Sequence, residues 1–178
     1  PRSWSSSIFI RVDENRPDVI CCLILGPEGT PYANGAFLFD IFLPQNYPNS
    51  PPKVLFKVTG GGTFRFNPNL YANGKVCLSL LGTWAGPSWI PAKSTLLQVL
   101  VSIQSMILVN DPYFNEPGYA RSQGTPRGSA ASLAYNKSIY YGTMRFAILE
   151  AIKSPHCLFR DVLKIHFTLK KSEIKEQC

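Results

Sequence analysis

The first part of the chain alternates short apolar runs with turn-forming residues, a pattern typical of β-strands joined by short loops. Ser6–Val12 and Val19–Leu25 are rich in strand-forming residues and are separated by the polar sequence DENRPD. Ala36–Leu43 is apolar on both faces, as a central strand would be, and Lys53–Val58 follows two prolines. Gly26–Gly35 consists of turn-forming residues. Four consecutive strands with short connections predict an antiparallel meander.

From about Trp89 onward, the spacing of apolar residues becomes helical. Leu96–Leu108 carries them on one wide stripe, which predicts a helix that packs on the sheet. Ser94 or Thr95 can cap its start, because a hydroxyl accepts a hydrogen bond from the backbone of the first turn. Asn110-Asp111-Pro112 ends this helix, since proline cannot continue it.

Two more helices are expected in the last third of the chain, at about Ser132–Lys153 and about Cys157–Lys171. Ser154-Pro155 divides them, and the polar stretch Gly118–Gly128 before them predicts a flexible connection. Because strands come first and helices afterwards, this order predicts an α+β fold. We expect a four-stranded antiparallel meander sheet with helices packed on one face, plus additional C-terminal helices.

Length and composition agree with one globular domain. The chain has 178 residues, of which 45% are hydrophobic and 16% charged, which is enough for a core. No apolar run reaches the roughly 20 residues that span a bilayer, so no membrane segment is expected. The opening residues PRSWSSS lack the apolar stretch of a signal peptide. A start at Pro1 suggests a fragment of a longer protein.

Charge and cysteines narrow the function classes further. The net charge of +7 is modest, and the lysines near the end are not interleaved with aromatic residues, so no nucleic-acid partner is expected. The five cysteines are odd in number and show no CxxC spacing, which argues against a disulfide framework or a metal site. These features favour a reducing compartment, the cytoplasm with or without the nucleus.

One cysteine lies in a long irregular segment between Gly60 and Trp89, and such loops are often functional. Cys77 follows the turn-forming Asn73-Gly74-Lys75 and comes eight residues after Asn69. A cysteine between apolar neighbours is often a buried and inert small side chain. A position in a loop and a nearby lysine favour a reactive thiol instead. Both interpretations stay open on these residues alone.

The residues around Cys77 resemble the active-site region of ubiquitin-conjugating enzymes, the E2 family. That family has a His-Pro-Asn tripeptide eight residues before its catalytic cysteine, and this chain has Asn67-Pro68-Asn69 there. Proline and the second asparagine match, whereas Asn67 replaces the histidine and can still hydrogen-bond to backbone. Further matches are Gly26-Pro27, Pro31-Tyr32, Gly35, Pro44, Tyr47-Pro48, Pro51-Pro52, Cys77–Trp84 and Trp89–Ala92.

The resemblance implies a single ubiquitin-conjugating domain over residues 1–178. The match is clearest in residues 1–117, and residues 118–178 form a helical C-terminal part. The sequences NPNLY, GKVCLS and PYFNEPGY are most similar to large E2 enzymes. This group includes the ubiquitin-conjugating domain of giant BIR-repeat proteins of the BRUCE type.

The resemblance also implies acyl-transfer chemistry. Cys77 would be the nucleophile that carries ubiquitin as a glycyl thioester. Asn69 would stabilise the oxyanion, hold the loop by hydrogen bonds, or do both. Glu116 would activate the acceptor lysine, or else be merely solvated. Tyr71, Leu78, Leu81 and Asn115 are expected to line or support the substrate site, and Tyr47 and Trp84 to belong to the core beneath it.

The implied partners are ubiquitin, an E1 activating enzyme, protein substrates and, in some reactions, an E3 ligase. The E1 consumes the ATP, so neither a cofactor nor a metal is expected in this chain, which should be monomeric. The family's opening helix, which E1 and E3 contact, has no match here, and Asn49-Ser50 replaces an aromatic residue used in E3 docking. The extra residues Ala85–Ser88 are candidates to gate acceptor access. The alternatives are conjugation of another ubiquitin-like modifier and a non-catalytic ubiquitin-binding variant.

Overall fold

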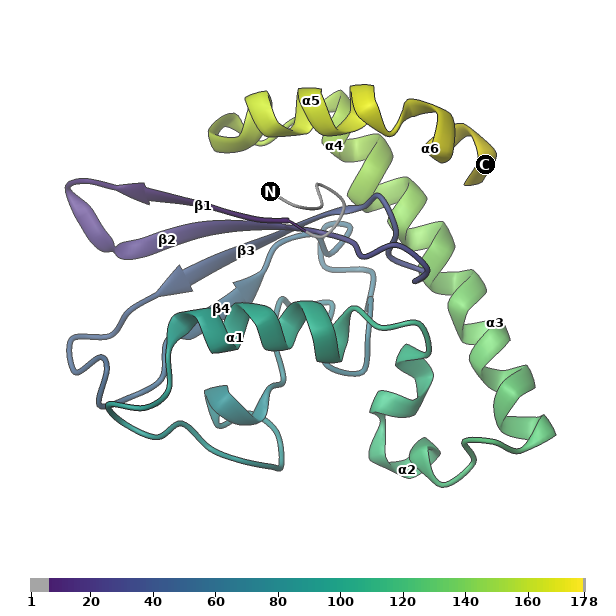
Figure 1. Cartoon of the computed structure of the whole chain (residues 1–178), viewed down its shortest axis with the longest axis horizontal. Coiled ribbons are helices and arrows are strands. Elements are labelled where there is room, and N and C mark those ends of the chain that lie inside the picture. Colours follow the sequence, from purple (N-terminus) through teal and green to yellow (C-terminus); the bar gives the residue numbers. More distant parts are fainter. Residues whose placement is uncertain (1–6, 178) are drawn as a thin grey trace.

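A four-stranded sheet forms the centre of the molecule (Figure 1). The computed structural model describes residues 7–177, so the expectations for residues 1–6 and for Cys178 lie outside it. The strands follow one another in the order β1-β2-β3-β4, and each neighbouring pair is antiparallel. The predicted meander is therefore confirmed. The strands are β1 (Ile8–Asp13), β2 (Arg16–Leu25), β3 (Ala36–Phe42) and β4 (Lys53–Phe56).

The first long helix begins where its capping residue predicts. Helix α1 (Leu96–Ser102) continues as a π-helical turn over Ile103–Ile107. The Thr95 hydroxyl accepts a hydrogen bond from the Gln98 backbone N–H at 3.2 Å, and the Gln98 side chain accepts one from the Thr95 N–H at 2.9 Å. This reciprocal pair is a capping box, which satisfies two backbone donors at the helix start.

The second long helical segment begins six residues earlier than the apolar spacing predicts. Its parts are α3 (Pro126–Gly142), a π-helical stretch (Thr143–Leu149) and α4 (Glu150–Lys153). Thr125 caps the start by accepting a hydrogen bond from Gly128, and Pro126 occupies the first turn, where no N–H is needed. The other helices are α2 (Pro117–Ala120), α5 (Arg160–Leu169) and α6 (Lys171–Gln177), with 3₁₀ turns at Ser79–Leu81, Pro112–Asn115 and Cys157–Phe159.

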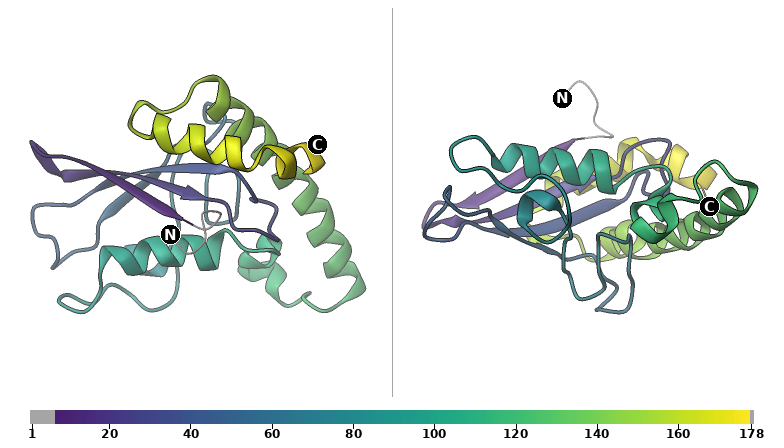
Figure 2. Two further views of the ribbon diagram at one scale, coloured as in Figure 1. Left: turned by 45° about the horizontal axis from the view of Figure 1, so that its top comes forward. Right: turned by 90° about the horizontal axis from the view of Figure 1, so that it is seen from below.

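Helices cover both faces of the sheet: α1 packs on one face, and α5, one of the expected additional C-terminal helices, packs on the other. Figures 1 and 2 show α1 and α5 on different sides of the strands. In β2, Cys22 and Ile24 belong to the core that includes α1, whereas Cys21 and Leu23 belong to a second core that includes Leu163 of α5. The reason lies in β2 itself. Its residues 20–25 are all buried, so each of its faces requires an apolar cover.

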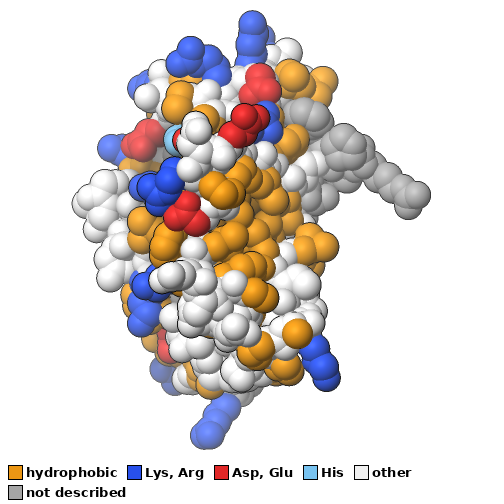
Figure 3. Space-filling view, turned by 90° about the vertical axis from the view of Figure 1, so that its left-hand side faces the viewer, with side chains coloured by type: hydrophobic (Ala, Val, Ile, Leu, Met, Phe, Trp, Pro, Cys, Tyr) orange, Lys and Arg blue, Asp and Glu red, His pale blue; other side chains and the backbone are white. Residues whose placement is uncertain are grey.

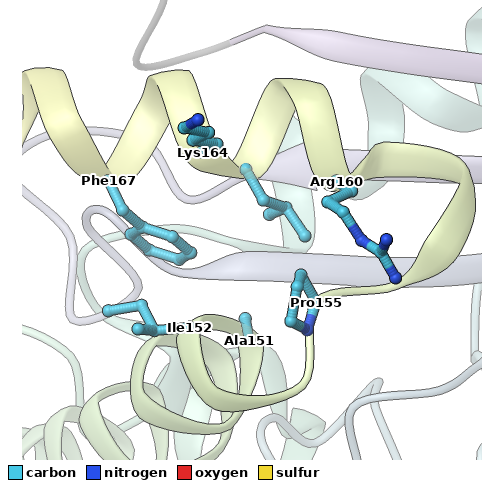
Figure 4. Close-up of a pocket in the computed structure, with 7 residues that line it drawn as sticks. Ala151, Ile152, Pro155, Arg160, Lys164 and Phe167 are labelled. Carbon is cyan, nitrogen blue, oxygen red and sulfur yellow. The ribbon is translucent and has the colours of Figure 1, made fainter.

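The surface has a hollow between two helices and a patch of exposed apolar side chains. A hollow of about 280 Å³ lies between α4 and α5, where Ile152 and Phe167 face each other and Lys164 stands at the rim (Figure 4). Apolar side chains also gather at the end of the molecule seen in Figure 3. Strand residues with exposed apolar side chains include Val19 and Phe42, which are directly paired across β2 and β3.

Candidate active site

A tight turn brings Cys77 next to Asn69. Leu70 forms isolated bridges with Asn67 and with Val76. The backbone therefore folds back on itself between Asn69 and Cys77. At the tip, Gly74 has a φ of +87°, and a Cβ there would lie 2.7 Å from the Phe56 carbonyl oxygen. Both facts require glycine. The Asn73-Gly74 turn signal in the sequence thus has a structural cause.

Two hydrogen bonds join Asn69 to the backbone of Cys77. The Cys77 N–H donates to the Asn69 carbonyl oxygen at 2.8 Å, and the Asn69 Nδ2 donates to the Cys77 carbonyl oxygen at 2.8 Å. The Asn69 Oδ1 is buried and has no hydrogen-bond partner among the described residues. An amide nitrogen carries two hydrogens. The side chain can therefore stay bonded to Cys77 and still offer a second hydrogen to another acceptor.

Asn67, which stands where the family has histidine, anchors this turn. Its Nδ2 donates to the Tyr32 hydroxyl at 2.9 Å and to the Ile107 carbonyl oxygen at 2.8 Å. Its Oδ1 accepts a hydrogen bond from the Asn69 N–H at 2.8 Å. The side chain is completely buried. Asn67 thus ties the turn to the end of the α1 helix and supports Asn69 directly, in line with the backbone bonding expected of it.

The Cys77 side chain lies at the wall of a hollow of about 230 Å³. The residue is only 2% exposed. Trp84, expected in the core, lines this hollow instead and is half-buried, whereas Tyr47 does pack on the core, with its ring 5.8 Å from that of Trp89. The lining residues are Asn69, Cys77, Leu78, Ser79, Trp84, Ala85, Pro87, Met106, Ile107 and Asn115.

The segment after Cys77 supplies part of the wall of the hollow. Its base is held by Thr83, whose hydroxyl accepts a hydrogen bond from the Leu78 N–H at 3.0 Å and donates one to the Val76 carbonyl oxygen at 2.8 Å. Two of the extra residues, Ala85 and Pro87, belong to the lining. The sequence marked these residues as an insertion, but neither Thr83 nor the lining residue Met106 carried a signal of its own.

The other predicted contact residues separate into two groups. Leu78 and Asn115 line the hollow, and the Asn115 side chain donates to the Met106 carbonyl oxygen at 2.9 Å. Tyr71 and Leu81 lie outside it. Leu81 lines another hollow beside β4, and the ring of Tyr71 lies 4.1 Å from the guanidinium carbon of Arg65.

Glu116 lies directly after the 3₁₀ turn that carries Asn115. Its Oε2 is 3.7 Å from Nη2 of Arg65, and its side chain is 37% exposed. Glu116 is not among the residues that line the hollow, but it is the sequence neighbour of one that does.

The remaining described cysteines are two buried thiols and one exposed thiol. Cys21 and Cys22 are buried in β2, and burial raises the pKa of their thiols to about 11 and about 12. Both therefore stay protonated at neutral pH. Cys157 is exposed on the other side of the sheet, beside α5. Across residues 7–177, His, Cys, Asp and Glu side chains form no group of three or more that could hold a metal ion.

The described part of the chain also contains no helix of the length and apolar character needed to cross a membrane.

Comparison with known proteins assigns the chain to a family. The chain matches the family described as ubiquitin-conjugating enzyme over residues 4–127. It therefore belongs to the ubiquitin-conjugating enzyme family, as its motifs predict. Enzymes of this family need no cofactor of their own, and they interact in general with ubiquitin, an E1 and E3 ligases.

Individual relatives agree with this assignment. The chain is 55% identical over 181 residues to the Homo sapiens dual E2 ubiquitin-conjugating enzyme/E3 ubiquitin-protein ligase BIRC6, covering 100% of this chain and 4% of that protein. It is 53% identical to the Caenorhabditis elegans probable ubiquitin-conjugating enzyme protein 17, covering 100% of this chain and 25% of that protein. The similarity to BIRC6 confirms the predicted relation to the large E2 enzymes. The chain thus spans only a small part of these relatives.

Proposed function

We propose that this chain accepts ubiquitin from E1 as a thioester on Cys77 and passes it to lysine amines of protein substrates. Family membership supports this proposal, and one arrangement carries it. Cys77 lies at the wall of a hollow, and the Asn69 amide is bonded to the backbone of the same cysteine. Acyl transfer requires a thiol together with a hydrogen-bond donor, and these two residues supply both groups in the proposed mechanism.

The first step is transthiolation. The Cys77 thiolate attacks the carbonyl carbon of the E1–ubiquitin thioester, a new carbon–sulfur bond forms, and the E1 thiolate leaves. A thioester is already activated, and cysteine is a strong nucleophile even with a few per cent of thiolate. No histidine is needed as a base in this mechanism. Of the two histidines, His166 is used elsewhere, since its Nε2 lies 2.9 Å from the Asn34 carbonyl oxygen.

The second step is aminolysis. A neutral lysine amine attacks the thioester carbon, and negative charge develops on the carbonyl oxygen before the Cys77 thiolate leaves. The second Nδ2 hydrogen of Asn69 is available to bind that oxygen, while the first holds the Cys77 carbonyl. Glu116 accepts the proton that the amine must lose. A donor of this kind typically accounts for about 10²–10³ in rate.

The burial of Cys77 adds one requirement. A thiol that is 2% exposed cannot meet the thioester of a protein partner. Residues of the wall, with Trp84, Ala85 and Pro87 as the candidates, must therefore move during transfer. Such motions of loops over active sites are common in enzymes. We propose this movement as part of the reaction cycle, in keeping with the expectation that Ala85–Ser88 gates access.

Charging with E1, ATP and ubiquitin, followed by a non-reducing gel, tests the function. We expect a thiol-sensitive adduct that is lost in Cys77→Ala and kept in Cys157→Ala, which removes an exposed cysteine. Persistence of the adduct in Cys77→Ala would refute the assignment. Absence of any adduct would instead support a non-catalytic ubiquitin-binding variant, and parallel reactions with other ubiquitin-like modifiers and their E1 enzymes test the choice of modifier.

The wider setting of the chain is proposed on the same basis. We propose that residues 1–178 act as one monomeric domain in the cytoplasm or nucleus, with E1, E3 ligases and protein substrates as partners. The described residues include no aromatic side chain between Pro48 and Pro51, where Asn49 and Ser50 stand. Engagement of an E3 is therefore expected to use other residues, which pull-down with purified E3 domains would test.

A further inference from the structure

Arg65 makes contacts that the proposed mechanism does not yet use. It lies two residues before Asn67, and its planar guanidinium donates two hydrogen bonds to backbone carbonyls of the active-site turn. Nε donates to the Asn67 carbonyl oxygen at 3.2 Å, and Nη2 donates to the Pro68 carbonyl oxygen at 2.7 Å. These are the two carbonyls that immediately precede Asn69. A fork of donors with fixed spacing can hold both, whereas a lysine ammonium is a single point charge.

The planar face of the same guanidinium packs on an aromatic ring. Its carbon lies 4.1 Å from the centre of the Tyr71 ring, close enough for a cation–π contact. Tyr71 lies on the Asn69–Cys77 loop, so Arg65 contacts both the Asn67-Pro68 backbone and the loop that follows it. This contact also gives Tyr71 a role consistent with its position outside the hollow.

The third contact is with Glu116, which follows the 3₁₀ turn Pro112–Asn115. Arg65 Nη2 lies 3.7 Å from Glu116 Oε2, with side chains 43% and 37% exposed. An ion pair this exposed contributes little to stability. Its separation also exceeds the usual length of a hydrogen bond. The pair therefore adds little to folding, but it brings the carboxylate near the guanidinium that is bonded to the turn.

Resting on the proposed function, we propose that Arg65 is a positioning residue for aminolysis. It fixes the turn that presents Asn69 and orients the Glu116 carboxylate toward the acceptor amine. Arg65 exchanges no proton. The amine nitrogen forms its bond to the thioester carbon, Glu116 takes the proton, and the Cys77 thiolate leaves. Arg65 thus couples the residue that meets the oxyanion with the residue that meets the amine.

The test compares Arg65→Ala and Arg65→Lys with Arg127→Ala, a matched control on an exposed residue of α3. Charging by E1 and single-turnover discharge of the thioester to free lysine are measured separately, over a range of lysine concentrations and pH. We expect charging within about twofold of wild type and discharge slowed roughly 10- to 100-fold in Arg65→Ala, because small misplacements of catalytic groups have effects of this size. Arg65→Lys should recover only a minor part.

A double-mutant cycle separates positioning from a merely structural role. If Arg65 acts through Glu116, then Glu116→Gln should slow discharge in the wild-type background and have much less effect in Arg65→Ala. An unchanged effect of Glu116→Gln in both backgrounds would overturn the proposal. Equal losses of charging and discharge in Arg65→Lys, together with a lowered Tm, would also overturn it.

The failure of this inference differs from the failure of the proposed function. A wild-type chain that forms no thioester refutes the function and the inference together. A wild-type chain that charges and discharges normally, with both Arg65 variants discharging at the wild-type rate, refutes only the role of Arg65.

Discussion

Two buried asparagines attach distant parts of this chain in different ways. Asn67 uses both its oxygen and its nitrogen, and its partners are Tyr32, Ile107 and Asn69. Asn34 meets α5 through its backbone carbonyl, which lies 2.9 Å from Nε2 of His166. There, the Asn34 Oδ1 and the His166 Nδ1 are buried without a hydrogen-bond partner among the described residues.

This difference indicates which of the two regions is held in a single conformation. A fully satisfied buried amide strongly favours a single arrangement, because any displacement leaves polar groups unpaired. The turn has such an amide in Asn67, and one buried atom beside it, the Asn69 Oδ1, is unpaired. The attachment of α5 leaves two buried atoms unpaired, one of them on a histidine ring that can take up a proton, and Asn34 also has a positive φ of 63°. We therefore expect the turn to be the more rigid of the two regions and the α5 attachment to respond to conditions.

The largest expected effect comes from the catalytic end of the rigid turn. Asn69→Ala should slow discharge to lysine by about 10²–10³, which corresponds to about 2.7–4 kcal/mol of barrier. Charging by E1 should be retained, because that step needs the thiol more than the donor. Single-turnover assays of both steps provide the measurement. Loss of charging as well as discharge would mean that Asn69 chiefly holds the loop.

Breaking the anchor of the turn should affect stability instead. Asn67→Ala leaves the Asn69 N–H and the Ile107 carbonyl without their partner, so we expect a loss of about 3 kcal/mol in the free energy of unfolding. Urea unfolding measures it, with the exposed Asn49→Ala as control. Asn67→His, the residue usual in the family, should cost less. A loss in Asn67→Ala no greater than in Asn49→Ala would contradict the account of the turn.

Acid should weaken the second region selectively. Burial lowers the pKa of His166 from its ordinary value of 6.5, although its bond to the Asn34 carbonyl acts in the opposite direction. The folded state therefore favours the neutral ring. This contribution to stability is complete above pH 6.5 and is lost as the pH falls through the lowered pKa of the folded state.

The measurement for this effect is urea unfolding at pH 7.5 and pH 5. His166→Gln should show a smaller difference between the two conditions than wild type, because it lacks the titrating ring. His156→Gln serves as the control and should keep the wild-type difference. Equal acid sensitivity in wild type and His166→Gln would remove His166 as the responsive element of the α5 attachment.

The smallest expected effect concerns how easily a reagent reaches Cys77 through the hollow. Trp84→Ala removes a large side chain from the lining of the hollow, so alkylation of Cys77 by iodoacetamide should become several-fold faster. Mass spectrometry reports the rate, and the exposed Cys157 serves as an internal reference. Leu81→Ala, outside the hollow, should leave the rate unchanged. An unaltered rate in Trp84→Ala would show that other residues limit access to the thiol.

Local patterns predicted much of the site. The Asn73-Gly74 turn, the NPN tripeptide and the position of Cys77 were all recognisable, since each depends on residues that are neighbours in sequence. The place of Trp84 was not recognisable. An aromatic residue in a loop is equally compatible with a core and with a lining position, and only the packing of Pro87 and Met106 around the hollow distinguishes them.

The sequence by itself determined the order of the strands and the capped start of α1, and it identified Cys77 and Asn69 as candidates for the chemistry. These follow from periodicity, caps and motifs, which act over a few residues. Only the tertiary structure decided that α5 covers the second face of the sheet, that Arg65 meets Glu116, and that Asn67 reaches a carbonyl 40 residues away. Such contacts depend on how distant segments pack, and no local pattern specifies which side chains will meet.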